Sequence, residues 1–369
     1  MPVIWGLILG FPVLVFLITL INALTAPMVA KGPRPGSHPL VSVLVPARNE
    51  EENIGGCLDS LLRQDYPNFE ILVLDDRSSD RTGGIVRQAA AANKRIRCLD
   101  GTNLPDGWTG KNWACHQLAQ SAGGEILLFT DADNRFSPDA VGRTVGWMEK
   151  LKLDLFSAFP EQQTLTWPEK LVVPSVYMTV YCYLPLWLTY FMPHPSLAAA
   201  NGQWMAFTRA SYDRLGGHES AAGEIVEDTF MARLAKKKKM KILTAAGTGA
   251  VRSRMYHNWS EIRQGFSKNL FGLMDYRLVP FLSLLFLMFA GYVLPYGLVF
   301  SQVFRVPAGI AVIVNILIRG ILAFKYRDPW ITVPLHPLAI LLTIFIGLDS
   351  VRVFRRGSLD WKGRKINFR

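Results

Sequence analysis

The sequence predicts a doubly wound α/β domain, with a mostly parallel sheet, that is flanked by transmembrane helices at both ends of the chain. Three continuous apolar runs, 41–47, 69–76 and 125–131, alternate with segments of helical pattern. Such runs are typical of parallel strands that are covered on both faces. Long uncharged segments near both termini are typical of helices that cross a bilayer.

Composition agrees with a membrane protein that has a basic soluble part. Half of the 369 residues are hydrophobic and only 19% are charged, yet the net charge is +11. The basic residues gather beside apolar segments and form no stripe interleaved with aromatic residues, which favours a membrane surface over nucleic acid. The four cysteines are irregularly spaced, so the sequence indicates neither a zinc site nor a disulfide framework.

The first element is an N-terminal transmembrane anchor, which we place at residues 1–30. This stretch contains no charged side chain, and 3–24 is long enough to span a bilayer. It lacks the basic start and the cleavage site of a signal peptide. Lys31 and Arg34 follow directly, so the positive-inside rule predicts that the next part of the chain is cytoplasmic. We expect the catalytic domain there, over residues 31–277.

The C-terminal membrane segments are expected within residues 278–350. Three apolar stretches lie there, 278–304, 306–324 and 329–348, and a basic tail follows over residues 351–369. If that tail is cytoplasmic, an even number of crossings must follow the catalytic domain. We therefore expect two of the three stretches to cross, and the sequence leaves open which two. The chain is then a multi-pass protein of the plasma (inner) membrane.

Polar residues end each predicted strand, which is where doubly wound folds bind their ligands. Arg48 follows the first run, Asp75 and Asp76 end the second, and Asp131 and Asp133 end the third. Neither the dinucleotide-binding glycine pattern nor a P-loop is present, so a bound phosphate must be neutralised in another way.

The stretch LLFTDADN, residues 127–134, offers such a way. Side chains two residues apart in an extended strand point to the same side, so Asp131 and Asp133 could reach one cation. Carboxylate oxygens suit Mg²⁺ or Mn²⁺, which keep positions open for phosphate oxygens. The plain alternative is a strand that ends in a turn.

Five motifs resemble those of inverting family 2 glycosyltransferases, which have the GT-A fold. They are VSVLVPARNEEENI, ILVLDDRSSDRT, GWTGKNWA, LLFTDADN and GEIVEDTFMARLAKK, and the resemblance covers residues 38–275. It implies an enzyme that transfers a hexose from a UDP-sugar, with inversion and with a metal ion. The stretches AAANGQWMAFTRASYDRLGGHES and GFSKN are most similar to bacterial carotenoid glycosyltransferases of the hydroxychlorobactene or diaponeurosporenoate type, which implies a hydroxyl or carboxyl of a lipid as acceptor.

The resemblance also implies roles for residues that bind the donor. Four residues would line the nucleoside pocket: Pro46, Ala47, Arg48 and Glu50. Asp76 would recognise the uracil, and Lys111 would contact the diphosphate or the nucleoside. Asp133 would bind the metal directly, and Asp131 would bind the ribose or the metal.

The catalytic pair implied by the resemblance is Glu227 with Asp228, where Asp228 is the base that deprotonates the acceptor. The plain alternative is that both residues complement the dipole of the helix that follows them. His257 is a candidate for a further metal ligand. Gln264 stands where processive polymer synthases carry Q-x-x-R-W, but the Arg-Trp pair is missing, so we do not expect polymerisation.

Residues 171–208 contain no Asp, Glu, Lys or Arg, although they lie between the metal pair and the base. Because both must meet one substrate, this stretch cannot cross the membrane once. We predict a proline-broken interfacial element over 171–200 that presents an apolar surface to a membrane lipid acceptor. A buried pair of helices is the alternative.

Three other functions stay open at this stage. The acceptor could be polyprenyl phosphate, or it could be a hopanoid or a glycerolipid. The chain could also be a non-catalytic membrane scaffold that only binds nucleotide.

Overall fold

The computed structural model describes residues 5–361 and 364–367, and the chain folds into two compact units. The sheet unit comprises Pro27–Glu161 and Leu186–Arg254, and the helical unit comprises Met1–Ala26, Gln162–Pro185 and Met255–Arg369. The structure thus groups 162–185 and 255–277 with the helical unit, whereas we expected them in the catalytic domain. Residues 1–4 of the predicted anchor, and 362–363 and 368–369 of the predicted tail, lie outside the described residues.

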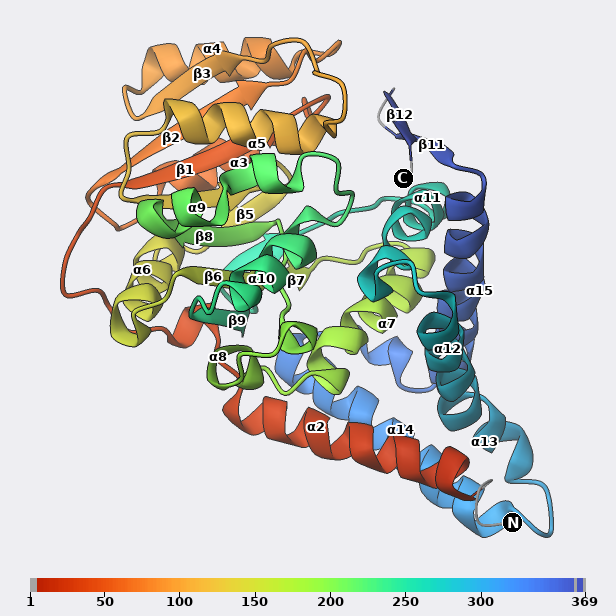
Figure 1. Cartoon of the computed structure of the whole chain (residues 1–369). Helices are drawn as coiled ribbons and strands as arrows, with labels where there is room; N and C mark the ends of the chain where they lie inside the picture. Colours follow the sequence, from red (N-terminus) through yellow and green to blue (C-terminus); the bar gives the residue numbers. More distant parts are fainter. Residues whose placement is uncertain (1–4, 362–363, 368–369) are drawn as a thin grey trace. The chain divides into compact units, whose positions relative to one another are not determined.

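The sheet unit is built on a seven-stranded sheet in the order β3-β2-β1-β4-β8-β6-β9 (Figure 1). Strand β1 runs parallel to β2 and β4, β2 to β3, and β6 to β9, whereas β8 runs antiparallel to β4 and β6. The predicted mostly parallel sheet is therefore confirmed. The strands are β1 Val41–Ala47, β2 Phe69–Asp75, β3 Ile96–Asp100, β4 Ile126–Thr130, β6 Leu155–Phe159, β8 Trp204–Thr208 and β9 Ile242–Ala246.

Strand β1 is almost entirely apolar because it contributes to two cores. Val43 and Val45 of β1 join a core that contains residues of α3, α4 and α6, whereas Leu44 joins a second core that contains residues of α5, α9 and α10. Alternate side chains of a strand point to opposite faces, so both faces must be apolar when both are covered. These helices are α3 Ile54–Leu62, α4 Thr82–Ala92, α5 Gly110–Ser121, α6 Ala140–Leu151, α9 Arg209–Leu215 and α10 Glu227–Lys237.

A small second sheet lies beside the carboxyl end of β4. Strand β5 (Asn134–Phe136) pairs antiparallel with β10 (Val251–Ser253), and the short β7 (Glu161–Gln162) completes the order β5-β10-β7. The register places Ser253 opposite Asn134. The polypeptide after β9 is thereby brought back to the LLFTDADN segment.

The helical unit contains four stretches that are long and apolar enough to cross a membrane. They are Ile8–Thr25, Leu278–Leu298, Arg305–Tyr326 and His336–Arg355. All three predicted C-terminal segments thus form such helices, and the expectation that two of them cross stays a prediction. The helices of this unit are α2 Phe11–Thr25, α7 Trp167–Tyr183, α11 Trp259–Asn269, α12 Leu278–Tyr292, α13 Leu294–Leu298, α14 Arg305–Tyr326 and α15 His336–Arg355.

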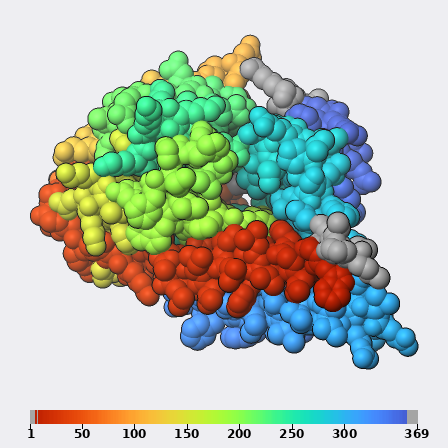
Figure 2. All heavy atoms as spheres, turned by 60° about the horizontal axis from the view of Figure 1, so that its bottom comes forward, coloured from red at the N-terminus to blue at the C-terminus, as the bar shows by residue number. Residues whose placement is uncertain are grey.

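The four candidate spans expose large apolar side chains, as helices in contact with lipid do. Leu24 of α2, Val279 of α12 and Phe324 of α14 are each at least 76% exposed. Helices α2 and α14 lie side by side and appear in red and light blue in Figure 2. The helical unit thus offers an apolar outer surface to a bilayer.

Helix α7 differs from these four spans because most of its side chains are buried. Thr166 and Glu169 form a capping box at its start, and Pro174 lies inside the helix. It packs against α2, α11 and α15, and the side chain of Asn22 in α2 donates to the carbonyl oxygens of Tyr181 and Leu184 at 2.7 and 2.8 Å. The segment 171–200 therefore begins as a buried helix and continues in the sheet unit through the short α8 (Leu188–Phe191). Its interfacial placement stays a prediction.

Candidate active site

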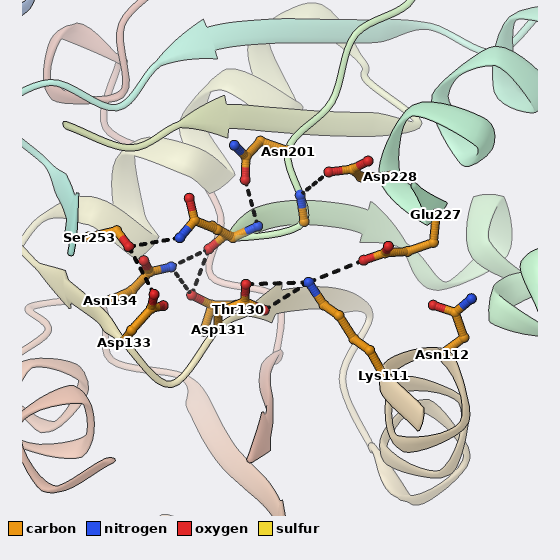
Figure 3. Close-up of polar contacts among 12 residues, drawn as sticks. Lys111, Asn112, Thr130, Asp131, Asp133, Asn134, Asn201, Glu227, Asp228 and Ser253 are labelled. Atoms are coloured by element: carbon orange, nitrogen blue, oxygen red, sulfur yellow. Dashed lines mark hydrogen bonds and ion pairs between the residues drawn. The ribbon is translucent and has the colours of Figure 1, made fainter. Parts of the chain in front are cut away.

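The two aspartates of LLFTDADN lie in a turn and not on an extended strand. Strand β4 ends at Thr130, and Ala132 and Asp133 form the turn that leads into β5. Asp131 contacts Lys111, whereas Asp133 Oδ2 accepts a hydrogen bond from Ser253 Oγ at 3.2 Å (Figure 3). We expected alternation along an extended strand to position this pair. That prediction was wrong, because the strand ends before both residues.

Lys111 lies between two carboxylates at the start of α5. Its Nζ is 3.0 Å from Asp131 Oδ1 and 3.1 Å from Glu227 Oε1. Burial lowers the pKa of the Lys111 amine, but the charges of Asp131 and Glu227 outweigh burial and hold that pKa well above its usual value. The side chain keeps 37% of its surface exposed. Lys111 is thus a fixed cation that a ligand can still reach.

Asp228 occupies the first turn of α10, next to Glu227. Its Oδ2 accepts from Gly202 N at 2.9 Å, and its Oδ1 accepts from Thr229 N at 2.6 Å. Burial and the charge of Glu227 raise the pKa of Asp228 to about 6, against the opposing effects of these hydrogen bonds and of Lys111. A positioned carboxylate with a pKa near neutral suits a general base.

Asn112 ties the Lys111 helix to the loop before α10, a role that we did not predict. This asparagine is fully buried, and its Nδ2 donates to the carbonyl oxygens of Ala221 at 2.5 Å, Ala222 at 3.2 Å and Glu224 at 2.9 Å. The loop leads directly into Glu227 and Asp228. The available signal was the position of Asn112 beside Lys111 in GWTGKNWA.

The turn before β8 is a second feature of the site that we did not predict. A Cβ atom on Gly202 would lie 3.0 Å from both Lys111 Nζ and Glu227 Oε1, so a side chain there would crowd both charged groups. The next residue, Gln203, donates through Nε2 to Ser253 Oγ at 2.7 Å. Because Ser253 in turn donates to Asp133, this turn connects the environment of Asp228 with that of Asp133 (Figure 3).

The predicted nucleoside residues lie where β1 and β2 end. Asp76 N donates to Ala47 O at 2.8 Å, and Arg48 Nη1 donates to Asp76 O at 2.6 Å. Glu50 N donates to Thr82 Oγ1 at 2.8 Å. The structure thus brings Ala47, Arg48 and Asp76 together, with Pro46 and Glu50 adjacent in the same segment. Their contact with a nucleoside stays a prediction.

The metal prediction rests on few protein ligands. Within residues 5–361 and 364–367, no group of three or more His, Cys, Asp or Glu side chains could hold a metal ion. His257 belongs to the helical unit, where its Nδ1 lies 3.2 Å from Glu261 Oε2. Asp131 and Asp133 therefore fit an ion that takes its other ligands from phosphate oxygens and water, as Mg²⁺ commonly does.

Comparisons with known proteins agree with this geometry. Residues 42–175 match the model of the family "Glycosyl transferase family 2". A 4,4'-diaponeurosporenoate glycosyltransferase of Staphylococcus haemolyticus (strain JCSC1435) is 27% identical over 241 residues, which is 62% of this chain and 60% of the relative. The enzyme of the same name from Staphylococcus aureus (strain MRSA252) is 24% identical over 348 residues, 90% of this chain and 89% of the relative.

A solved structure supports the fold. The mannosyltransferase PcManGT from Pyrobaculum calidifontis, in complex with GDP-Man and Mn²⁺, superposes with a TM-score of 0.61 at 20% identity and covers 93% of this chain and 94% of its own. The chain spans about three fifths of the length of the first curated relative. Residues 42–175 therefore carry a glycosyltransferase family 2 domain, and the structure has the GT-A fold, as the motifs predicted.

Proposed function

We propose that this protein is a membrane-embedded glycosyltransferase that transfers a hexose from a UDP-sugar to a hydroxyl or carboxyl of a lipid, such as a carotenoid. The observation that carries the proposal is the arrangement of Lys111, Asp131, Glu227 and Asp228 at the carboxyl edge of the sheet. The lipid acceptor is supported by the four apolar helices and by relatives that are named for diaponeurosporenoate.

The proposed reaction is a single displacement. The acceptor oxygen attacks the anomeric carbon, the bond from that carbon to the diphosphate oxygen breaks, and Asp228 takes the proton of an acceptor hydroxyl. A positioned base contributes about 10² to 10⁴ in rate. Its two backbone hydrogen bonds orient the carboxylate of Asp228, and its raised pKa gives it affinity for the proton. A carboxyl acceptor is already ionised and needs this base much less.

The departing diphosphate gains negative charge, and Lys111 is placed to stabilise it. Its ammonium group is held by Asp131 and Glu227 before any ligand arrives, so little reorganisation is required. Asp131 and Asp133 would hold a Mg²⁺ or Mn²⁺ ion, which supplies Lewis-acid stabilisation of the phosphate oxygens when bound. Ser253 orients Asp133 for this role.

The experiment is a transfer assay with the full chain in lipid vesicles, Mn²⁺, a lipid extract that contains hydroxylated and carboxylated carotenoids, and one radiolabelled donor at a time. UDP-glucose, UDP-galactose and GDP-mannose serve as donors. We expect labelled lipid from a UDP-sugar, and loss of the product on chelation or in Asp133→Ala. Asp59→Ala, which changes an exposed aspartate of α3, is the control.

Each other outcome corrects a particular part of the proposal. Label from GDP-mannose alone would overturn the donor, and label on polyprenyl phosphate alone would overturn the acceptor. Full activity in Asp133→Ala would overturn the metal assignment. UDP binding without labelled lipid from any donor would show a scaffold and not an enzyme.

A further inference from the structure

A fully buried cation lies inside the helical unit, far along the sequence from the catalytic motifs. Arg319 of α14 has no exposed surface, although its helix is long and apolar enough to cross a membrane. Its Nε donates to His336 Nδ1 at 2.8 Å, and its Nη2 donates to Ser175 Oγ at 2.7 Å. The guanidinium thus joins three helices, α14, α15 and α7.

Arg319 has no acid within ion-pair distance in the part of the chain that the structure describes. Asp328 is the carboxylate that acts on it, and it does so only through longer-range attraction. A fully buried guanidinium without a bonded anion is one of the costliest groups to place in an apolar bundle. The two neutral acceptors, His336 Nδ1 and Ser175 Oγ, would not require a permanent charge here, so the charge itself needs an explanation.

Some polar groups near Arg319 are left without a hydrogen-bond partner among the described residues. Its Nη1 has no hydrogen-bond partner within residues 5–361 and 364–367, and the same holds for His336 Nε2 and the Tyr296 hydroxyl. Because His336 Nδ1 accepts from Arg319, the proton of a neutral His336 must lie on Nε2, which makes it a second available N–H. Buried donors without acceptors indicate a missing anionic group.

We propose that Arg319 and His336, with Ser175 orienting the guanidinium, bind the anionic head of a lipid inside the helical unit. A carboxylate or a phosphate supplies the oxygens that Nη1 and His336 Nε2 lack, and arginine is the side chain that suits both groups. A free anion would have to enter an apolar bundle, whereas a lipid brings its own apolar tail. The site would hold either a carboxylate acceptor, which rests on the proposed function, or a phospholipid of the bilayer.

The test uses the full chain, delipidated in dodecyl maltoside, and measures binding by native mass spectrometry and by the thermal midpoint. The probes are oleate, methyl oleate, dioleoyl phosphatidate and inorganic phosphate. We expect oleate or phosphatidate to bind and methyl oleate not to bind. Stronger binding of oleate identifies a carboxylate lipid, and stronger binding of phosphatidate identifies a phospholipid. Equal binding of oleate and methyl oleate, or an equal effect of inorganic phosphate, overturns the proposal.

Matched variants test the residue. Arg319→Gln should weaken binding of the favoured lipid about tenfold to a hundredfold, because a hydrogen bond to a charged group is lost. Arg305→Gln removes an exposed arginine at the start of the same helix and should bind like the wild type. Unchanged binding in Arg319→Gln overturns the assignment. If that variant does not fold, the comparison of oleate with methyl oleate in the wild type still tests whether the site requires an anionic head group.

One further variant separates this inference from the proposed function. Asp228→Asn should lose transfer to an alcohol acceptor but keep lipid binding, because Asp228 lies in the sheet unit. Lipid binding with no transfer in the wild type would refute the proposed function and leave the Arg319 site standing.

Discussion

The sheet unit and the helical unit each hold a cation in a polar cluster, and the two cations differ in what surrounds them. Lys111 lies between the carboxylates of Asp131 and Glu227, whereas Arg319 is bonded to the neutral groups of His336 and Ser175. In the first cluster, two carboxylates more than match the charge of Lys111 before a ligand arrives. The second cluster keeps a charge that its own residues do not balance. The two clusters therefore differ in whether carboxylates are bonded to the cation. Two carboxylates contact Lys111, whereas only neutral groups of the described part of the chain are bonded to Arg319.

The largest expected effect on the rate of transfer comes from Asp228→Asn in the active-site cluster of the sheet unit. With an alcohol acceptor, the rate of transfer should fall about 10² to 10⁴-fold, because the amide cannot take the proton. With a carboxylate acceptor the loss should be much smaller. Initial rates with paired alcohol and acid acceptors measure this, and calorimetry with UDP checks that nucleotide binding persists. An alcohol-acceptor rate equal to that of the wild type would remove Asp228 from the mechanism.

Lys111→Met should lower kcat/KM about 10²-fold. The departing diphosphate loses a fixed cation, and Asp131 and Glu227 are left facing each other without it. Lys237→Met, which removes an exposed lysine of α10, is the matched control. If both variants lose the same activity, the loss reflects the net charge of the protein, and the assigned role of Lys111 is wrong.

The pH dependence of kcat/KM offers a smaller and more specific effect. Asp228 works as a base only when it is ionised, so the rate should fall as the pH drops through its pKa of about 6, by about tenfold at one unit below. Glu227→Gln removes a charge that raises this pKa, and the acid limb should move to lower pH. A limb that stays in place or moves upward in Glu227→Gln would contradict the assignment of the limb to Asp228.

The smallest expected effect is on stability, and it concerns Asn112, which holds the loop before α10. Asn112→Ala removes the side-chain donor shared by the carbonyl oxygens of Ala221, Ala222 and Glu224, which should destabilise the sheet unit by about 1–3 kcal/mol. A lower thermal midpoint than that of Asn103→Ala, which changes an exposed asparagine, would show it. Equal midpoints would mean that the loop before α10 is held by other contacts.

The sheet, and the meeting of β1 and β2 at one edge, could be predicted because they depend on local pattern. Runs such as 41–47 are apolar on both faces, and the ends of parallel strands meet at one edge, which correctly placed Ala47 beside Asp76. Asn112 and Gly202 could not be found in this way. Asn112 contacts Ala221, 109 residues later, and the space around Gly202 is set by Lys111 and Glu227 from two other segments.

Two further differences between the predictions from sequence and the structure have physical causes. The side-chain alternation used for Asp131 and Asp133 requires an extended backbone, but β4 ends at Thr130. For residues 171–185, an apolar composition is equally typical of an interfacial helix and of a helix that other helices cover. Only packing distinguishes the two, and α7 is mostly buried.

The central claim is a single displacement in which Asp228 activates the acceptor on the face opposite to the departing diphosphate. The most direct measurement is the anomeric configuration of the glycolipid made from a UDP-α-hexose, read from the one-bond carbon–proton coupling of the anomeric centre by NMR. The account predicts a β-linked product. An α-linked product would contradict it.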